Sequence, residues 1–177
     1  GIADSVSVAR AQELGMDVII TDHHEANGKI PPAYAVVNPK RDDCTYPEKI
    51  LCGSGVVFKL IQAILQKNRF GLGEGKEKWF LDLVGMATLS DMVPLTGENR
   101  ALAFYGLKVL KKSPRPGLQK LWKKLGVKEH NITEDDIGFS LAPRINAASR
   151  MGHTKDAFTL LRTTDVVEAD EASNNLN

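Results

Sequence analysis

The chain has 177 residues, of which 42% are hydrophobic and 25% are charged. These proportions are typical of a globular protein and exclude a disordered or fibrous chain. The 23 basic and 22 acidic residues give a net charge of +1, which excludes a uniformly basic coat protein for nucleic acid but not a local basic patch. No apolar run approaches the roughly 20 residues of a membrane helix, so no membrane partner is expected.

Helix and strand patterns alternate in the first part of the chain. A helix is predicted over residues 5–14, with Asp4 or Ser5 as its N-cap. Two short apolar segments at 16–21 and 33–38 have the β-branched composition of buried strands. A helix that leads into a strand and then a polar loop is typical of a parallel sheet.

The remainder of the chain is predicted to be mainly helical. Apolar faces and turn residues place helices over residues 55–68, 79–89, 100–112, 118–125, 134–141, 155–161 and 166–176. Residues 113–117 contain two prolines and a glycine and are the predicted linker. The sequence therefore predicts an α/β domain with a parallel sheet over residues 1–112, followed by a helical connector over residues 113–177.

Asp22, His23 and His24 directly follow the first predicted strand. Ligands of open α/β sheets bind outside the carboxyl ends of the strands, where this loop must lie. A carboxylate beside two imidazoles suits Mn²⁺, Mg²⁺ or Zn²⁺. The alternative interpretation is a surface histidine pair at a turn, with Asp22 capping the loop.

Asp91 ends an apolar helix just before a Val-Pro turn. The helix dipole is negative at this end, so an acid there needs another partner, and a divalent cation is one candidate. A solvated aspartate that starts the turn is the simpler alternative.

Two further segments have the composition of phosphate-binding sites. Arg144 and Arg150 flank Asn146 among small residues, and a guanidinium matches phosphate oxygens. The alternative is a pair of surface arginines beside a helix end. Gly53 and Gly55 open a predicted helix and are weak candidates for backbone contacts to phosphate, with a turn and cap as the default explanation.

The stretch from Asn99 to Lys128 contains nine basic residues and no acidic residue. Such a stretch suits a polyanion, and its candidates for nucleic-acid binding are Lys111, Lys112 and Arg115. A solvated cationic face is the alternative.

Together these segments resemble the DHH phosphoesterase superfamily and, within it, the RecJ-type exonucleases specific for single strands. The resemblance is carried by TDHH at 21–24, LCGSGVVFKL at 51–60, LVGMATLSDMVPLTGENRAL at 83–102, RPGLQKL at 115–121 and ITEDDIGFSLAPRINAASRMG at 132–152. It implies a 5′–3′ exonuclease that uses two Mn²⁺ or Mg²⁺ ions to hydrolyse phosphodiester bonds of single-stranded DNA in repair and recombination.

The resemblance also implies roles for individual residues. His23 and Asp91 are expected to be metal ligands, and His24 is expected to face the scissile phosphate or support the metal. Asp22 is the carboxylate that orients a histidine. Contacts to nucleotide phosphate or sugar are expected from Arg144, Asn146 and Arg150.

The family's aspartate-rich first motif and the GGGH-type motif of its DHHA1-type second domain are absent from the sequence. We therefore expect Gly1 and Asn177 to be cut ends, residues 1–112 to be the C-terminal part of a DHH domain, and the two-metal site to be incomplete. Cys44 and Cys52 form no disulfide framework, which favours a reducing cytoplasm. Single-strand-binding protein and a helicase are the expected protein partners.

Three alternatives remain open. One is a DHH phosphodiesterase that acts on oligoribonucleotides or cyclic dinucleotides. Another is a DNA-binding scaffold with a degenerate DHH domain that catalyses nothing. The third is a plain α/β core with an adventitious histidine pair that binds neither metal nor DNA.

Overall fold

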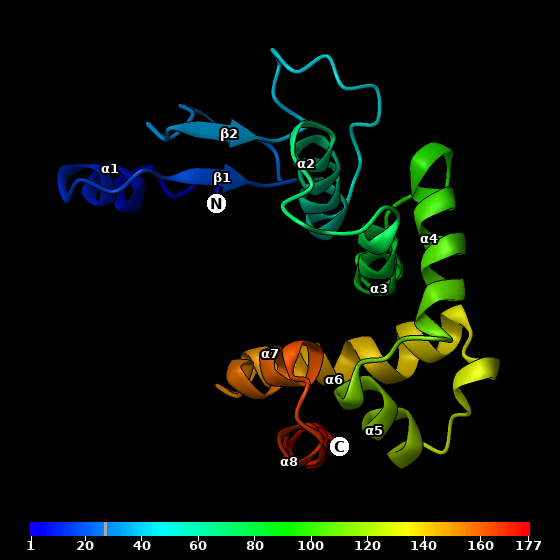
Figure 1. Cartoon of the computed structure of the whole chain (residues 1–177). Coiled ribbons are helices and arrows are strands. Elements are labelled where there is room, and N and C mark those ends of the chain that lie inside the picture. The colour runs from blue at the N-terminus through cyan, green and yellow to red at the C-terminus, as the bar shows by residue number, and fades with distance from the viewer. Residues whose placement is uncertain (27) are drawn as a thin grey trace.

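The computed structural model describes residues 1–26 and 28–177 (Figure 1). Its elements in chain order are α1 (Ser5–Glu13), β1 (Ile19–Thr21), β2 (Ala35–Val37), α2 (Gly53–Lys67), η1 (Lys76–Phe80), α3 (Leu81–Ser90), α4 (Gly97–Leu110), α5 (Pro116–Lys124), η2 (Glu129–Asn131), η3 (Asp136–Leu141), α6 (Ala142–Arg150), α7 (Thr154–Arg162) and α8 (Val166–Asn175). The strands and α1 lie to one side of α2, and α5 to α8 form a helical group below α3 and α4 in Figure 1. None of the helices in the described ranges is long and apolar enough to cross a membrane.

The two strands form the parallel pair that the sequence predicts. Their register places Ile19 opposite Ala35. Both strands are shorter than the apolar segments that predicted them, because only three residues of each segment find partners in a ladder. The backbone N–H of Asp22 still donates to the carbonyl of Val37 at 3.0 Å, so the pairing reaches into the loop after β1. The predicted α/β class is confirmed.

The first helix agrees with the prediction except at its cap. Asp4 occupies the N-cap position, but its side chain makes no capping hydrogen bond. The helix stops before Gly15, whose φ of 77° lies in the left-handed region that glycine adopts without strain.

α3 and α4 cross at two glycines. A Cβ added to Gly85 would lie 2.6 Å from the Cα of Gly106, so the two helix backbones meet where neither carries a side chain. The single helix predicted over 79–89 is in fact the end of η1, which is a 3-10 helix, followed by α3. The two parts differ in their hydrogen bonds, because η1 has the i→i+3 pattern of a 3-10 helix and α3 has the i→i+4 pattern of an α-helix.

The helix α6 was not predicted, since the helix expected over residues 134–141 ends just before it. It continues directly from η3, a π-helix, so that Pro143 falls in the first turn of α6. A missing N–H is tolerated there. Pro143 followed by a run without glycine or proline is the sequence signal that could have located this helix.

The described residues form two clusters of buried apolar side chains. The smaller cluster lies around α2 and contains Leu51, Val56, Phe58, Val84 and Leu102. The larger cluster contains Met86, Leu110, Leu118, Leu121, Trp122, Ile132, Ile137, Leu141, Ala148, Ala157, Leu160, Ala172 and Leu176. The larger core thus includes residues from both sides of the predicted boundary at residues 112 and 113.

Candidate metal centre

The carboxylate of Asp22 accepts several hydrogen bonds in the loop that follows β1. It accepts from the backbone N–H groups of Ile2 (2.6 Å), His23 (2.7 Å) and His24 (3.1 Å). The ring Nδ1 of His24 lies 2.7 Å from the same carboxylate. Burial raises the pKa of Asp22, but these hydrogen bonds outweigh burial and hold the pKa well below its usual range. The side chain is therefore an ionised acceptor at the centre of the loop.

The ring of His24 is largely exposed to solvent, apart from its contact with Asp22. An ionised carboxylate can only accept, so Nδ1 of His24 must carry the proton. In the neutral ring this leaves the lone pair on Nε2. The rings of His23 and His24 lie 4.4 Å apart between centroids, so the second ring is immediately beside the first.

His23 faces a different carboxylate. Its Nδ1 lies 3.5 Å from Oδ2 of Asp91, which is the C-cap residue of α3. The chain turns sharply after Asp91, because Met92 has a φ of 53°, in a region that residues other than glycine rarely adopt. The fold thus brings together two residues that the sequence singled out independently.

The first turn of α2 lies against the same histidine. A Cβ added to Gly53 would lie 3.4 Å from Cδ2 of His23. The N–H of Gly55 donates to the sulfur of Cys52, the N-cap residue of this helix. Gly53 therefore lies at the site, whereas Gly55 does not fit the predicted phosphate contact because its N–H is already used.

The pair formed by His23 and Asp91 fits two ligands of a shared cation. Ligand atoms bound to one ion at about 2.1 Å are about 3 to 3.5 Å from each other, and the 3.5 Å between Nδ1 and Oδ2 lies in this range. An imidazole nitrogen with a carboxylate oxygen suits Mn²⁺. Among residues 1–26 and 28–177, no group of three or more His, Cys, Asp or Glu side chains is arranged to hold a metal. The described residues therefore supply part of a ligand set.

The three candidate phosphate-binding residues of the connector do not share one face of α6. Asn146 and Arg150 are one helical turn apart and both exposed. Arg144 is half-buried, and its guanidinium donates to the carbonyl of Ser140 at 2.9 Å. Only Asn146 and Arg150 thus present a common polar surface.

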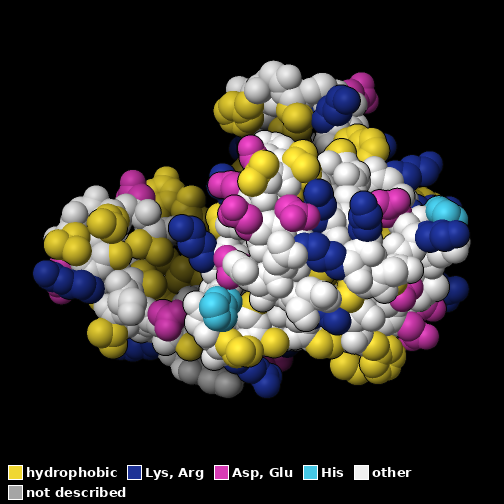
Figure 2. Space-filling model, turned by 90° about the horizontal axis from the view of Figure 1, so that it is seen from below, with side chains coloured by type: hydrophobic (Ala, Val, Ile, Leu, Met, Phe, Trp, Pro, Cys, Tyr) yellow, Lys and Arg dark blue, Asp and Glu magenta, His cyan; other side chains and the backbone are white. Residues whose placement is uncertain are grey.

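The basic stretch is partly neutralised by acids from other parts of the chain, which the sequence analysis did not expect. Asp170 on α8 lies 3.3 Å from Nζ of Lys120 and 3.7 Å from Nζ of Lys124. Figure 2 shows Lys and Arg side chains interspersed with Asp and Glu over the face seen from below. Arg115 is paired with the buried carboxylate of Asp82 at 2.8 Å, so its predicted contact to nucleic acid does not fit its position. Lys111 and Lys112 remain at the end of α4.

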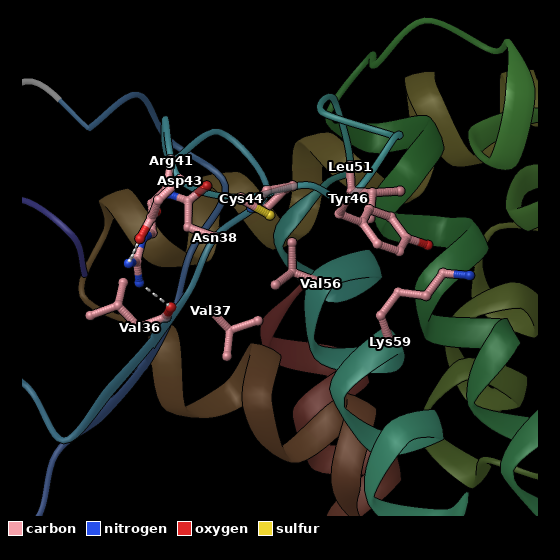
Figure 3. A pocket seen from close by; sticks show the side chains of 11 residues that line it. Val36, Val37, Asn38, Arg41, Asp43, Cys44, Tyr46, Leu51, Val56 and Lys59 are labelled. Carbon is pink, nitrogen blue, oxygen red and sulfur yellow. Dashed lines mark hydrogen bonds and ion pairs between the residues drawn. The ribbon is translucent and has the colours of Figure 1, made fainter.

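A pocket of about 370 Å³ lies between β2, the loop after it and α2 (Figure 3). Apolar side chains such as Val37, Leu51 and Val56 form much of its wall. The guanidinium of Arg41 donates hydrogen bonds to the carboxylate of Asp43 and to the backbone carbonyl of Val36. Lys59 pairs with Glu98, so each charged residue that lines the pocket already has a partner of opposite charge within the chain.

Sequence reasoning missed Asn38, which also lines this pocket. Its side-chain amide donates to the backbone carbonyl of His24 at 2.9 Å. Like Asp22, Asn38 directly follows a strand, and the carboxyl ends of parallel strands meet at one edge of a sheet. Position after β2 is therefore the signal that could have identified it.

Comparison with known proteins agrees with the fold and the motif. Residues 1–88 match the family model described as DHH family, N-terminal domain. The chain is 44% identical over 171 residues to the single-stranded-DNA-specific exonuclease RecJ of Bacillus subtilis, covering 97% of the chain and 21% of that protein. Residues 1–88 therefore belong to the DHH family.

Other DHH-family relatives extend the similarity to the helical part of the chain. RecJ of Escherichia coli is 34% identical over 191 residues, which cover 100% of the chain and 32% of that protein. The crystal structure of an exonuclease RecJ bound to manganese superposes with a TM-score of 0.84 at 36% identity, covering 99% of the chain and 43% of that structure. RecJ of Thermus thermophilus in complex with Mn²⁺ gives a TM-score of 0.82 at 34% identity, covering 99% of the chain and 26% of that structure. The chain therefore spans about a fifth to a third of the length of these curated relatives.

Proposed function

We propose that this chain forms part of the active site of a metal-dependent exonuclease that degrades single-stranded DNA from the 5′ end. The observation that carries the proposal is the approach of His23 Nδ1 and Asp91 Oδ2 to 3.5 Å at the carboxyl end of the parallel strands. Its similarity to proteins named as single-stranded-DNA-specific exonucleases, one of them bound to manganese, supports the choice of reaction and metal.

In this proposal His23 and Asp91 hold Mn²⁺ or Mg²⁺ as part of a two-metal site. When bound, the ions supply an activated water and stabilise the leaving oxygen of an in-line displacement. Asp22 keeps the proton of His24 on Nδ1, so the lone pair on Nε2 is available to a metal ion, which fits the metal-supporting role expected for His24. The backbone N–H of Gly53 at the start of α2 adds a donor for a phosphate oxygen.

The remaining parts of the proposal concern the strand and the cellular setting. Asn146 and Arg150 on α6, with Lys111 and Lys112, are assigned to the DNA backbone. Residues 1–112 are assigned to a DHH domain and residues 113–177 to a connector that leads to a DHHA1-type domain. Both cysteines are free thiols, which supports a reducing cytoplasm. Single-strand-binding protein and a helicase stay as predicted partners in repair and recombination.

A chimera tests the proposal. Residues 1–177 replace the aligned segment of the Bacillus subtilis RecJ, which is 44% identical over 171 residues. We expect the folded chimera to digest single-stranded DNA with Mn²⁺, to spare duplex DNA, and to lose this activity with His23→Ala. A folded but inactive chimera would favour the scaffold alternative, and selective cleavage of short oligoribonucleotides would favour the small-substrate phosphodiesterase. Either outcome would refute the exonuclease.

The isolated 177-residue chain is expected to bind Mn²⁺ weakly and to lack nuclease activity. The reason is that the described residues supply only two ligands at one position, while a two-metal centre requires ligands for both ions. Incubation of the purified chain with end-labelled single-stranded DNA and Mn²⁺ provides the measurement. Robust stepwise digestion under these conditions would overturn the expectation.

Replacing His23 by alanine is expected to weaken Mn²⁺ binding by the isolated chain at least about tenfold, because an imidazole ligand is removed. Calorimetric titration of the variant beside the parent measures the change. His153→Ala is the matched control, since Nδ1 of His153 lies 3.4 Å from Asp156 in a comparable pair on another part of the chain. Equal affinities of the parent and the His23→Ala chain would contradict a metal centre at this position.

A further inference from the structure

Asn38 lies where the chain leaves β2, directly beside the loop that carries the two histidines. Its side chain is 3% exposed. Nδ2 donates to the backbone carbonyl of His24 at 2.9 Å, and Oδ1 accepts from the backbone N–H of Lys40 at 2.9 Å. One buried amide thus joins the loop after β1 to the loop after β2.

The chemistry of the two partners determines which way the amide faces. A carbonyl oxygen can only accept, so the NH₂ group must point to His24. A backbone N–H can only donate, so Oδ1 must point to Lys40. Both ends of the side chain are therefore committed, and neither partner can be satisfied with the amide turned over.

The hydrogen bond from Asn38 complements those of Asp22. Asp22 accepts from the backbone N–H of His24 and from its ring, which holds the N-terminal side of this residue. Asn38 binds the carbonyl on the C-terminal side. A second contact between the loops is the ion pair of Lys40 with Glu25, 2.9 Å from Nζ to Oε1, but the Glu25 side chain is largely exposed, so this pair contributes little.

We propose that Asn38 is a positioning residue for the metal centre, which acts by holding the His23–His24 backbone through the carbonyl of His24. This inference rests on the proposed function, since it assigns His23 as a metal ligand and His24 as the neighbour that supports the metal. A ligand is effective only where its own support holds it in place, and loss of such support costs metal affinity. Asn38 touches neither substrate nor metal in this assignment.

Two substitutions distinguish the hydrogen bond from Asn38 to His24 from the local turn that Asn38 forms with Lys40. Asn38→Asp and Asn38→Ser both retain an oxygen that can accept from the N–H of Lys40, as aspartate and serine do in such turns. Neither retains the NH₂ donor to His24. Asn38→Asp also adds negative charge near the site, which would by itself attract a cation more strongly. Weaker metal binding in this variant therefore cannot be an effect of charge.

Nitrogen-detected NMR of the metal-free 177-residue chain is the first measurement, with the amide and ring signals of His23 and His24 as the readout. We expect both Asn38 variants to shift these signals while thermal unfolding stays cooperative. The second measurement is calorimetric Mn²⁺ titration, where the affinity is expected to fall about tenfold or more. If Asn38→Asp does not fold because of its buried carboxylate, Asn38→Ser gives the same comparison without added charge.

Asn68→Ala is the matched control. Oδ1 of Asn68 accepts from the backbone N–H of Phe70 at 2.9 Å, which is the same local turn at an exposed position away from the histidines. It should leave the histidine signals and the Mn²⁺ affinity unchanged. Unchanged histidine signals in both Asn38 variants would refute the positioning role. Failure of the parent chain to bind Mn²⁺ would instead refute the proposed metal centre, and the NMR comparison would still decide the role of Asn38.

Discussion

Gly117→Ala is expected to lower the free energy of unfolding by at least about 3 kcal/mol. This value is at the upper end of the usual cost of adding atoms to a well-packed core. Gly117 is buried in the first turn of α5 and packs against the backbone of α7. An added Cβ would lie 2.7 Å from the carbonyl carbon of Leu160 and still nearer to its oxygen. No side-chain rotation relieves a contact with backbone, so α5 and α7 would have to separate within the larger core.

Urea denaturation followed by circular dichroism measures this loss. Gly138→Ala is the matched control, because Gly138 is also helical but has no atom near the position of an added Cβ. Alanine there is expected to stabilise the chain by roughly 0.5 kcal/mol through its higher helix propensity. If Gly117→Ala unfolded at the same urea concentration as the parent, this result would contradict the close packing of α5 against α7.

Asp82→Ala is expected to cost about 3 kcal/mol of unfolding free energy, because it leaves a partly buried guanidinium without its counter-charge. The Asp82 carboxylate is 1% exposed and accepts from the side chains of Ser113 (2.7 Å) and Arg115 (2.8 Å). Arg115 also donates to the carbonyl of Leu161 at 2.9 Å. The ion pair therefore ties α3 and the end of α7 to the start of α5.

A double-mutant cycle isolates the pair. Arg115→Ala leaves a buried carboxylate unpaired, so each single variant carries a penalty that the double variant avoids. We expect the double variant to lose about 1 to 3 kcal/mol less than the sum of the two single variants. Glu13→Ala is the control, since its pair with Arg10 is exposed and is worth less than about 0.5 kcal/mol. A loss in Asp82→Ala no larger than in Glu13→Ala would contradict the structural role of this pair.

The ion pair of Arg115 with Asp82 shows what the pattern of charges along the sequence cannot predict. A run of basic residues without acids predicts a surface for polyanions, yet Asp82 and Asp170 approach three of these residues from other elements. Charge patterning along a chain does not report partners that are distant in sequence. The same limit explains Arg144, whose position on the half-buried side of α6 depends on a helix that its motif did not predict.

The position of the candidate metal site was more predictable, for a physical reason. Asp22, His23 and His24 follow an apolar β-branched strand, and the ends of parallel strands are where α/β proteins place their chemistry. Asp91 was singled out because a carboxylate at a helix C-terminus lacks a favourable dipole. Both arguments use only local sequence, and the 3.5 Å between His23 and Asp91 joins them.

The sequence by itself determined most of the helices, the parallel strand pair, the DHH motif and the residues most suited to bind a cation. These depend on periodicity, turn residues and side-chain type, which are properties of neighbouring positions. Only the tertiary structure decided which polar groups are already used and which are available. In the folded chain the N–H of Gly55 is hydrogen-bonded to Cys52, and Arg115 is paired with Asp82. The side chain of Asn38 donates a hydrogen bond to the carbonyl of His24. A hydrogen bond or ion pair requires two groups to meet in space, and for Arg115 and Asp82 the separation of 33 residues leaves no trace in either local pattern.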